Sequence, residues 1–159
     1  MKKIFFALVL SLFTLQNAYG LITVDITRGN LDPLPIAVSP LHVDSKSEKI
    51  SSFETSTLGE EISKIVEKNF KSTGLFNPLK KDSFVQKPDI AHLKPRFEDW
   101  RLIKAQALVT GKLLIKNNKL KVEFRLWDLT AAKEMVALSF TTTPNNWRRV
   151  AHIISDKIY

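Results

Sequence analysis

The chain has 159 residues and no cysteine, and its 24 Lys and Arg against 16 Asp and Glu give it a formal net charge of +8 at pH 7. Without cysteine it has neither a disulfide framework nor a site for a lipoprotein anchor. The positive charge favours anionic partners, but the lysines and arginines are scattered along the sequence, which is typical of a solvated surface.

The first 20 residues have the layout of a secretory signal peptide. Two lysines precede an apolar run at residues 4–15, and the small residues Ala18 and Gly20 stand just before a cleavage site at Leu21. A buried helix would not explain this order of charge, apolar run and small residues. The run is shorter than the about 20 residues that span a bilayer, so we expect no stable membrane anchor after cleavage.

We therefore expect a protein of the bacterial periplasm. Loss of Lys2 and Lys3 with the leader lowers the net charge from +8 to +6, so the exported chain stays basic. The remaining length fits one domain that buries a core without disulfide bonds. Acidic proteins, lipid head groups and lipopolysaccharide remain as anionic partners, whereas export argues against nucleic acid.

Residues 21–27 alternate between apolar and polar side chains, the period of a strand with one wet face. The segment at 28–33 then breaks the pattern, because Gly29 and Asn30 tolerate positive φ and Pro33 lacks an amide donor. We predict a turn or a mobile hinge there. The apolar face of the strand comprises Ile22, Val24 and Ile26.

The next apolar stretch, residues 34–38, lies between two prolines, and its β-branched content predicts a core or edge strand. Residues 44–56 are rich in Ser, Lys and Glu and predict a loop.

Thr57 and Glu60 have the spacing of a capping box, which predicts that a helix begins here. Apolar residues then recur at intervals of three and four, as on one face of an amphipathic helix. Lys71 and Gly74 supply the cation and the left-handed cap expected at its end. The apolar face comprises Leu58, Ile62, Ile65, Val66 and Phe70.

Beyond this helix, residues 76–79 predict a short extended segment, and the polar residues 80–95, with two prolines, predict mostly loop. Phe97, Trp100 and Ile103 recur at the interval of a short helix packed on the core.

From Gln106 the hydrophobic period becomes two, which predicts three antiparallel strands in a meander. Asn117 and Asn118 can adopt the positive φ of a tight hairpin turn, and residues 130–132 reverse the chain again. One face of the three strands must be buried under helices. That face comprises Val109, Gly111, Leu113 and Ile115, then Leu120, Val122, Phe124 and Leu126, then Val136, Leu138, Phe140 and Thr142.

A second amphipathic helix is predicted from Asn145 onward. Tyr159 is still in phase with its apolar stripe and nothing caps the last carbonyls, so we expect that the chain is cut inside an element. The apolar stripe comprises Trp147, Val150, Ile154 and Ile158. The predicted fold class is α+β, a mixed sheet with a carboxy-terminal antiparallel meander packed against two main amphipathic helices.

Residues that could carry chemistry do not form a recognisable set. The three histidines, His42, His92 and His152, lack metal-ligand spacing and favour surface or packing roles. Paired acids at 60–61 and 98–99 fall in the first turns of predicted helices, where they complement the helix dipole. With no nucleophile–base pair, phosphate loop or dinucleotide fingerprint, we expect no enzyme, no catalytic residue, no cofactor and no metal.

The tryptophans could stack on bases or sugars, but Trp100 and Trp147 lie on apolar helical faces, which favours core packing. Trp127 instead continues the polar face of its strand. A sheet covered on both sides would explain it.

Several segments resemble, in the same order, proteins of the TolB family of the alphaproteobacterial type. The first is residues 25–38, with Arg28-Gly29-Asn30 at the predicted hinge. The others are residues 74–79, 97–101 with 105–111, 124–128 and 147–152. The resemblance runs from residue 21 to the end, but it covers only the amino-terminal α/β domain of that family, which residues 34–159 would form.

The resemblance implies a periplasmic adaptor of the Tol-Pal envelope system and not an enzyme. Such a protein links the inner-membrane Tol complex, through TolA, to Pal and the outer membrane, and it supports outer-membrane integrity and invagination during cell division. In the family, Pal binds a six-bladed propeller that follows this domain, and that propeller is missing here.

The resemblance also implies that residues 21–33 form a partner-binding strand and hinge that contacts the carboxy-terminal domain of TolA. The residue pattern alone leaves open a permanent edge strand of the chain's own sheet. An alternative function is a stand-alone basic periplasmic module that binds anionic envelope polymers. The predicted TolA-binding residues are Leu21, Ile22, Thr23, Val24, Asp25, Ile26, Thr27, Arg28, Gly29, Asn30, Leu31 and Asp32.

Overall fold

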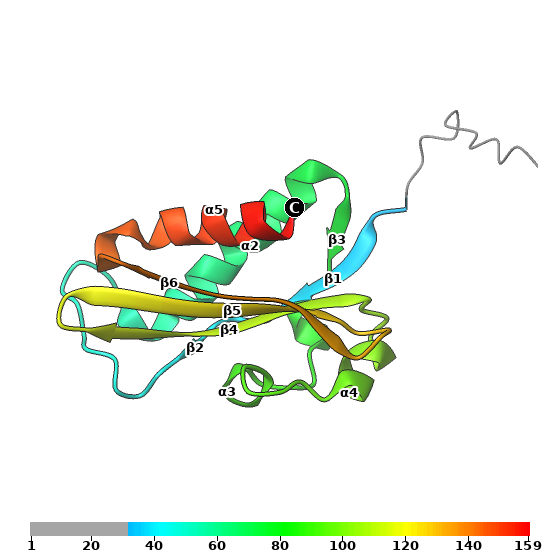
Figure 1. Cartoon of the computed structure of the whole chain (residues 1–159), viewed down its shortest axis with the longest axis horizontal. Helices are drawn as coiled ribbons and strands as arrows, with labels where there is room; N and C mark the ends of the chain where they lie inside the picture. The colour runs from blue at the N-terminus through cyan, green and yellow to red at the C-terminus, as the bar shows by residue number, and fades with distance from the viewer. Residues whose placement is uncertain (1–31) are drawn as a thin grey trace, which may run out of the picture. The chain divides into compact units, whose positions relative to one another are not determined.

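The computed structural model describes residues 32–159, which form one compact unit (Figure 1). The predicted signal peptide and residues 21–31 of the predicted binding strand lie outside the described residues. Within residues 32–159, no helix is both long enough and apolar enough to cross a membrane.

The unit is built on one mixed sheet. Its strands run in the order β3-β1-β4-β5-β6, and the short β2 also pairs with β4. The first three are parallel to one another, whereas β4, β5 and β6 form an antiparallel meander. The strands are β1 (Leu34–Val38), β2 (His42–Val43), β3 (Phe76–Pro78), β4 (Ala107–Lys116), β5 (Lys119–Asp128) and β6 (Lys133–Thr142).

Helices cover both faces of this sheet (Figure 1). The two long helices, α2 and α5, lie on one face, and the short α3 and α4 lie on the other. The α+β prediction, with a carboxy-terminal meander under two amphipathic helices, is confirmed. The α-helices are α2 (Leu58–Thr73), α3 (Pro88–Ala91), α4 (Phe97–Leu102) and α5 (Trp147–Ile158), and the 3-10 turns are η1 (Thr55–Thr57), η2 (Lys81–Ser83) and η3 (Pro144–Asn146).

The main core lies between the sheet and the long helices. Ile62 and Phe70 of α2 and Ile154 of α5 are buried against alternate residues of β4 and β5, including Leu113 and Phe124. Two glycines permit close approach. A Cβ on Gly59 would lie 1.8 Å from the carbonyl oxygen of Leu41, and one on Gly111 would lie 2.4 Å from that of Glu123.

A second core on the opposite face explains Trp127. Its ring packs with Trp100 and Leu108 under α4, and it is only 7% exposed. The indole N–H of Trp127 donates to Thr110 Oγ1 at 2.9 Å, and that of Trp100 donates to Gln86 Oε1 at 2.9 Å. The expectation of a sheet covered on both sides, with the tryptophans in cores, is therefore confirmed.

The hairpin turn, the strand at 34–38 and the cap at Gly74 also match expectation. Asn117 and Asn118 have φ of 50° and 56°, and Gly74 has φ of 72°. Residues 34–38 form an interior strand rather than an edge.

The predicted capping box is wrong. A 3-10 turn precedes α2, so Thr57 is already helical, with φ −94° and ψ −6°, and its hydroxyl donates to the carbonyl oxygen of Glu54 instead of capping. Glu54 caps the 3-10 turn by accepting from the Ser56 amide at 3.3 Å.

The segment at 80–95, which was predicted to be mostly loop, contains two short helical turns, η2 and α3. Pro88 stands at the start of α3, a position that proline favours.

Candidate functional site

Asp32 is the one residue of the predicted TolA-binding segment that the structure describes, and it is exposed. Two residues later β1 begins, where the Leu34 amide donates to the carbonyl oxygen of Leu75 at 2.8 Å. Because β1 pairs with β3 on one side and with β4 on the other, its edges are occupied.

The two outer strands of the described sheet differ in length and protection. β3 has three residues and ends on Pro78, which cannot donate to a further strand. β6 has ten residues, and a register shift opposite Leu126 and Trp127 leaves Met135 as a bulge residue. Bulges and prolines both discourage unwanted pairing at sheet edges.

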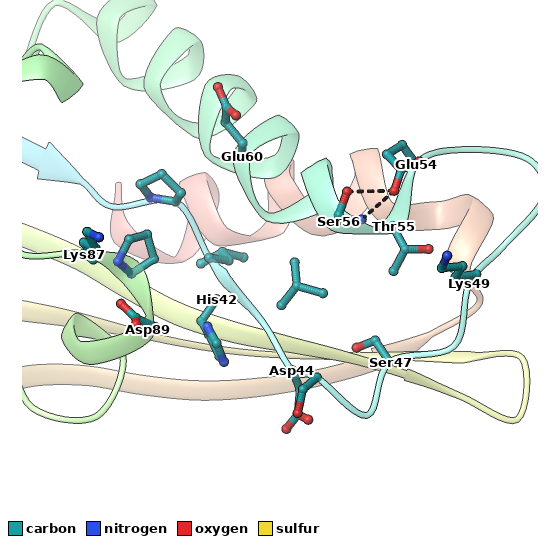
Figure 2. A pocket seen from close by; sticks show the side chains of 15 residues that line it. His42, Asp44, Ser47, Lys49, Glu54, Thr55, Ser56, Glu60, Lys87 and Asp89 are labelled. Atoms are coloured by element: carbon teal, nitrogen blue, oxygen red, sulfur yellow. Dashed lines mark hydrogen bonds between the residues drawn. The ribbon is translucent and has the colours of Figure 1, made fainter.

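A hollow of about 600 Å³ lies beside β2, between η1 and the start of α3 (Figure 2). Its lining contains side chains of both charges, including the acids Asp44 and Asp89 and the lysines Lys49 and Lys87. On its rim, the Ser56 hydroxyl donates to Glu54 Oε1 at 2.7 Å, and this hydrogen bond is the main cause that lowers the pKa of Glu54. No nucleophile–base pair is formed by these residues.

Two of the histidines come together beside this hollow. The rings of His42, on β2, and His92, after α3, stack with centroids 4.4 Å apart and planes 6° from parallel. Burial, followed by the neighbouring His92, lowers the pKa of His42. Sequence spacing could not show this pair, because it depends on how α3 packs under the sheet. Within residues 32–159, no group of three or more metal-ligating side chains gathers.

His152 lies exposed on the surface of α5, in keeping with the expected surface or packing role. Its Nδ1 lies 3.0 Å from Asn69 Nδ2, and the same amide donates to Ser155 Oγ at 2.9 Å, which ties α2 to α5.

The paired acids form ion pairs with basic residues close to them in the chain. Glu60 and Glu61 both pair with Lys64, at 3.2 and 2.9 Å, on the outer surface of α2. Glu98 pairs with Arg101 at 2.8 Å on α4. The acids at 60–61 and 98–99 lie in the first turns of α2 and α4, as predicted.

Comparison with known proteins supplies the family. Residues 22–135 match the TolB amino-terminal domain. The chain is 63% identical over 145 residues to the Tol-Pal system protein TolB of Pelagibacter ubique (strain HTCC1062), covering 90% of this chain and 32% of that protein. The chain thus spans about a third of the length of this relative.

Solved structures agree on the fold. The crystal structure of TolB from Acinetobacter baumannii aligns with 81% of this chain and 28% of its own, with a TM-score of 0.62 at 18% identity. A PelC variant dodecamer from Paraburkholderia phytofirmans aligns with 77% of this chain and 86% of its own, with a TM-score of 0.51 at 13% identity.

Proposed function

Because the chain belongs to the TolB amino-terminal domain family, we propose that it works as an adaptor of a Tol-Pal system whose residues 21–32 bind the carboxy-terminal domain of TolA. In this proposal the chain is exported to the periplasm and performs no catalysis. Contact with Pal belongs to a propeller beyond these residues, and the link to outer-membrane integrity and cell division runs through that assembly.

One observation carries the proposal. Strand β1 is hydrogen-bonded on both sides, to β3 and β4, and residues 32–159 form a compact unit with two closed cores. The domain therefore does not need residues 21–31 to complete its sheet. We infer that the strand-patterned segment at residues 21–27 adds to the sheet of a partner instead.

Strand addition is the binding mode that this pattern favours. Main-chain hydrogen bonds to an exposed sheet edge of the partner supply affinity, and alternate side chains fill pockets. Ile22, Val24 and Ile26 provide those alternate side chains. Gly29 and Asn30 allow the chain to turn between the bound strand and β1 without backbone strain.

Two neighbouring substitutions test this mode. Ile26→Ala removes a side chain that fills a pocket, so it should weaken binding to the TolA carboxy-terminal domain at least about tenfold, as truncation of an interface anchor does. Thr27→Ala, the matched control, changes a side chain on the other face and should leave affinity within about twofold. Calorimetric titration measures both. Equal losses in the two variants would contradict a strand-like contact.

Ionic strength separates this function from binding of anionic polymers. A contact made by main-chain hydrogen bonds and apolar pockets should keep most of its affinity between low and high salt, whereas binding through scattered lysines falls steeply as charges are screened. Repeating the titration of the unmodified chain across a salt series distinguishes the two. A steep loss with salt would favour the polymer-binding alternative.

A further inference from the structure

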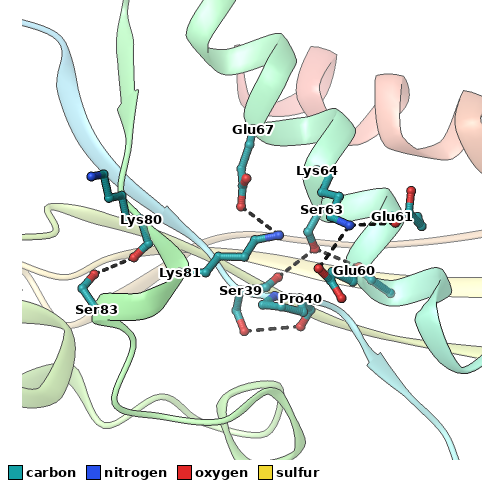
Figure 3. Close-up of polar contacts among 11 residues, drawn as sticks. Ser39, Pro40, Glu60, Glu61, Ser63, Lys64, Glu67, Lys80, Lys81 and Ser83 are labelled. Atoms are coloured by element: carbon teal, nitrogen blue, oxygen red, sulfur yellow. Dashed lines mark hydrogen bonds and ion pairs between the residues drawn. The ribbon is translucent and has the colours of Figure 1, made fainter.

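Five lysines line a single hollow of about 420 Å³ between the outer surface of α2 and the segment after β3. Lys64, Lys80 and Lys81 are labelled in Figure 3. Lys64, Lys68 and Lys71 come from α2, where spacings of four and three residues place them on one face of the helix. Lys80 and Lys81 come from the chain that follows Pro78. These lysines are scattered in the sequence, and only the packing of β3 against α2 brings the two groups together.

Only part of this positive charge is neutralised. Lys64 pairs with Glu60 and Glu61, and Lys81 Nζ lies 3.3 Å from Glu67 Oε1. The other three lysines, Lys68, Lys71 and Lys80, form no ion pair with any residue between 32 and 159. Of the acids, only Glu67 lines the hollow.

Glu67 is a half-buried carboxylate that lines the same hollow as these lysines. Burial raises its pKa, and the nearby Lys81 opposes that rise. Figure 3 shows Lys81 reaching from the far side of the hollow toward Glu67. Glu67 Oε1 is buried and, among the described residues, receives no well-aligned hydrogen bond, although the Lys81 ammonium lies at ion-pair distance. The Glu67 carboxylate thus pairs with Lys81 and does not neutralise Lys68, Lys71 or Lys80.

We propose that this hollow binds a phosphate group. Planar carboxylates are best held by the fork of an arginine, but no arginine lines the hollow. Lysine ammonium groups act as separate point charges, which suits the oxygens of a tetrahedral phosphate. Lys68, Lys71 and Lys80, which form no ion pair with another residue of 32–159, supply the charge for such an anion. This site lies outside residues 21–32 and goes beyond the proposed contact with TolA.

The size of the hollow bears on the ligand class. Ligand pockets typically measure about 300–1,000 Å³, so a hollow of about 420 Å³ has room for more than inorganic phosphate. We therefore expect the phosphate to be part of a phosphomonoester, either free in solution or as a lipid head group. Both sources present the same group to the lysines.

The first measurement is an NMR titration of the full chain with glycerol 3-phosphate at constant ionic strength. Saturable shifts of the backbone amides at residues 64–71 and 79–81 support the site. Chloride at equal ionic strength is the control. If glycerol 3-phosphate and chloride give the same shifts, or if neither saturates, the proposal is overturned.

Charge-matched variants locate the binding. Lys68→Ala with Lys71→Ala should weaken binding of glycerol 3-phosphate at least about tenfold, because two unit charges near the anion are lost. Lys116→Ala with Lys119→Ala removes the same charge at the β4–β5 hairpin, outside the hollow, and should change affinity less than about twofold. Glu67→Gln removes the opposing charge and should strengthen binding about threefold. Equal losses in the two double variants would overturn the proposal.

Vesicles distinguish the two sources of phosphate. The full chain is sedimented with phosphatidylcholine vesicles that contain phosphatidic acid, and with vesicles that lack it. Lipid-dependent sedimentation that the Lys68/Lys71 variant loses supports the site and assigns it to a head group. Binding of glycerol 3-phosphate without sedimentation supports the site and assigns it to a soluble ester. Absence of both overturns the proposal.

Discussion

At the residue scale, Gly59 determines how closely the start of α2 approaches the chain before β2. The Leu41 amide donates to the carbonyl oxygen of Gly59 at 3.2 Å, so the two backbones are in direct contact. An added Cβ would overlap the Leu41 carbonyl. Gly74, at the other end of α2, has open space around it but a φ of 72°.

We expect alanine substitution of these two glycines to lower the free energy of unfolding by different amounts. Gly59→Ala gains about 1 kcal/mol of helix propensity but must displace the Leu41 backbone, and we expect a net loss of about 2 kcal/mol in the free energy of unfolding. Gly74→Ala strains only its own backbone and should cost about 1 kcal/mol. Urea unfolding measures both. A larger loss for Gly74→Ala would contradict the close contact.

The histidine pair predicts a dependence of stability on pH. Burial and the facing His92, with a smaller contribution from Lys112, lower the folded-state pKa of His42 below 6.5, while Asp44 and Asp89 oppose this shift. Just below pH 6.5 the unfolded chain then binds more protons at His42 than the folded chain does. His42 therefore costs stability as the pH falls through that window.

Melting temperatures at pH 7.5 and pH 5.5 test this prediction. The drop between the two pH values should be smaller in His42→Asn than in the unmodified chain, because the variant has no imidazole to protonate. If both proteins lose the same number of degrees, the stacked pair does not contribute to acid sensitivity.

At the scale of elements, the second core under α3 and α4 depends on a few buried polar contacts. Trp127 and Thr110 lie on neighbouring strands, are 7% and 1% exposed, and hydrogen-bond to each other. Removing either the hydroxyl of Thr110 or the indole N–H of Trp127 leaves the other group buried without a hydrogen bond. Removing both groups leaves no unsatisfied group behind.

A double-mutant cycle follows from this contact. Thr110→Val should lower the free energy of unfolding by about 1–3 kcal/mol, because the indole N–H is left unsatisfied. Trp127→Phe should lower it as well, through the lost hydrogen bond and the smaller ring. Together they should cost less than the sum of the two single losses. Additive losses in urea unfolding would show that the hydrogen bond adds no coupling.

The elements that could be predicted are those with strong local signals. Asn117 and Asn118 specify the hairpin turn locally, and the apolar stripes of α2 and α5 need only their own periodicity. Strand β2 and helix α3 could not be predicted, because each has four residues or fewer and exists through contacts with distant parts of the chain. The capping box predicted at Thr57 was wrong because the sequence does not reveal that a 3-10 turn precedes the helix.

The candidate sites likewise divide into those with a local sequence signal and those that depend on contacts between distant segments. The period-two pattern at residues 21–27 and the hinge after it are local, so the binding strand could be proposed from sequence. The stacked histidines and the five-lysine hollow each join segments that are far apart in the chain. Neither has a local signature beyond the lysine spacing on α2 and the doublet Lys80-Lys81.

At the scale of the whole molecule, the leader at residues 1–20 predicts that the chain is exported. Signal peptidase should cut before Leu21, because Ala18 and Gly20 are the well-placed small pair after the apolar run. Intact-mass analysis of periplasmic material should give the mass of residues 21–159. Recovery of a chain that still carries Met1 would contradict export by this leader.

We propose that residues 21–32 carry the contact with TolA while residues 33–159 fold without them. The most direct measurement is a calorimetric titration of the TolA carboxy-terminal domain with the exported chain and with the same chain lacking residues 21–32. We expect the deletion to abolish binding and to leave the circular dichroism spectrum and the unfolding transition nearly unchanged. A shortened chain that binds TolA normally, or that fails to fold, would contradict the account.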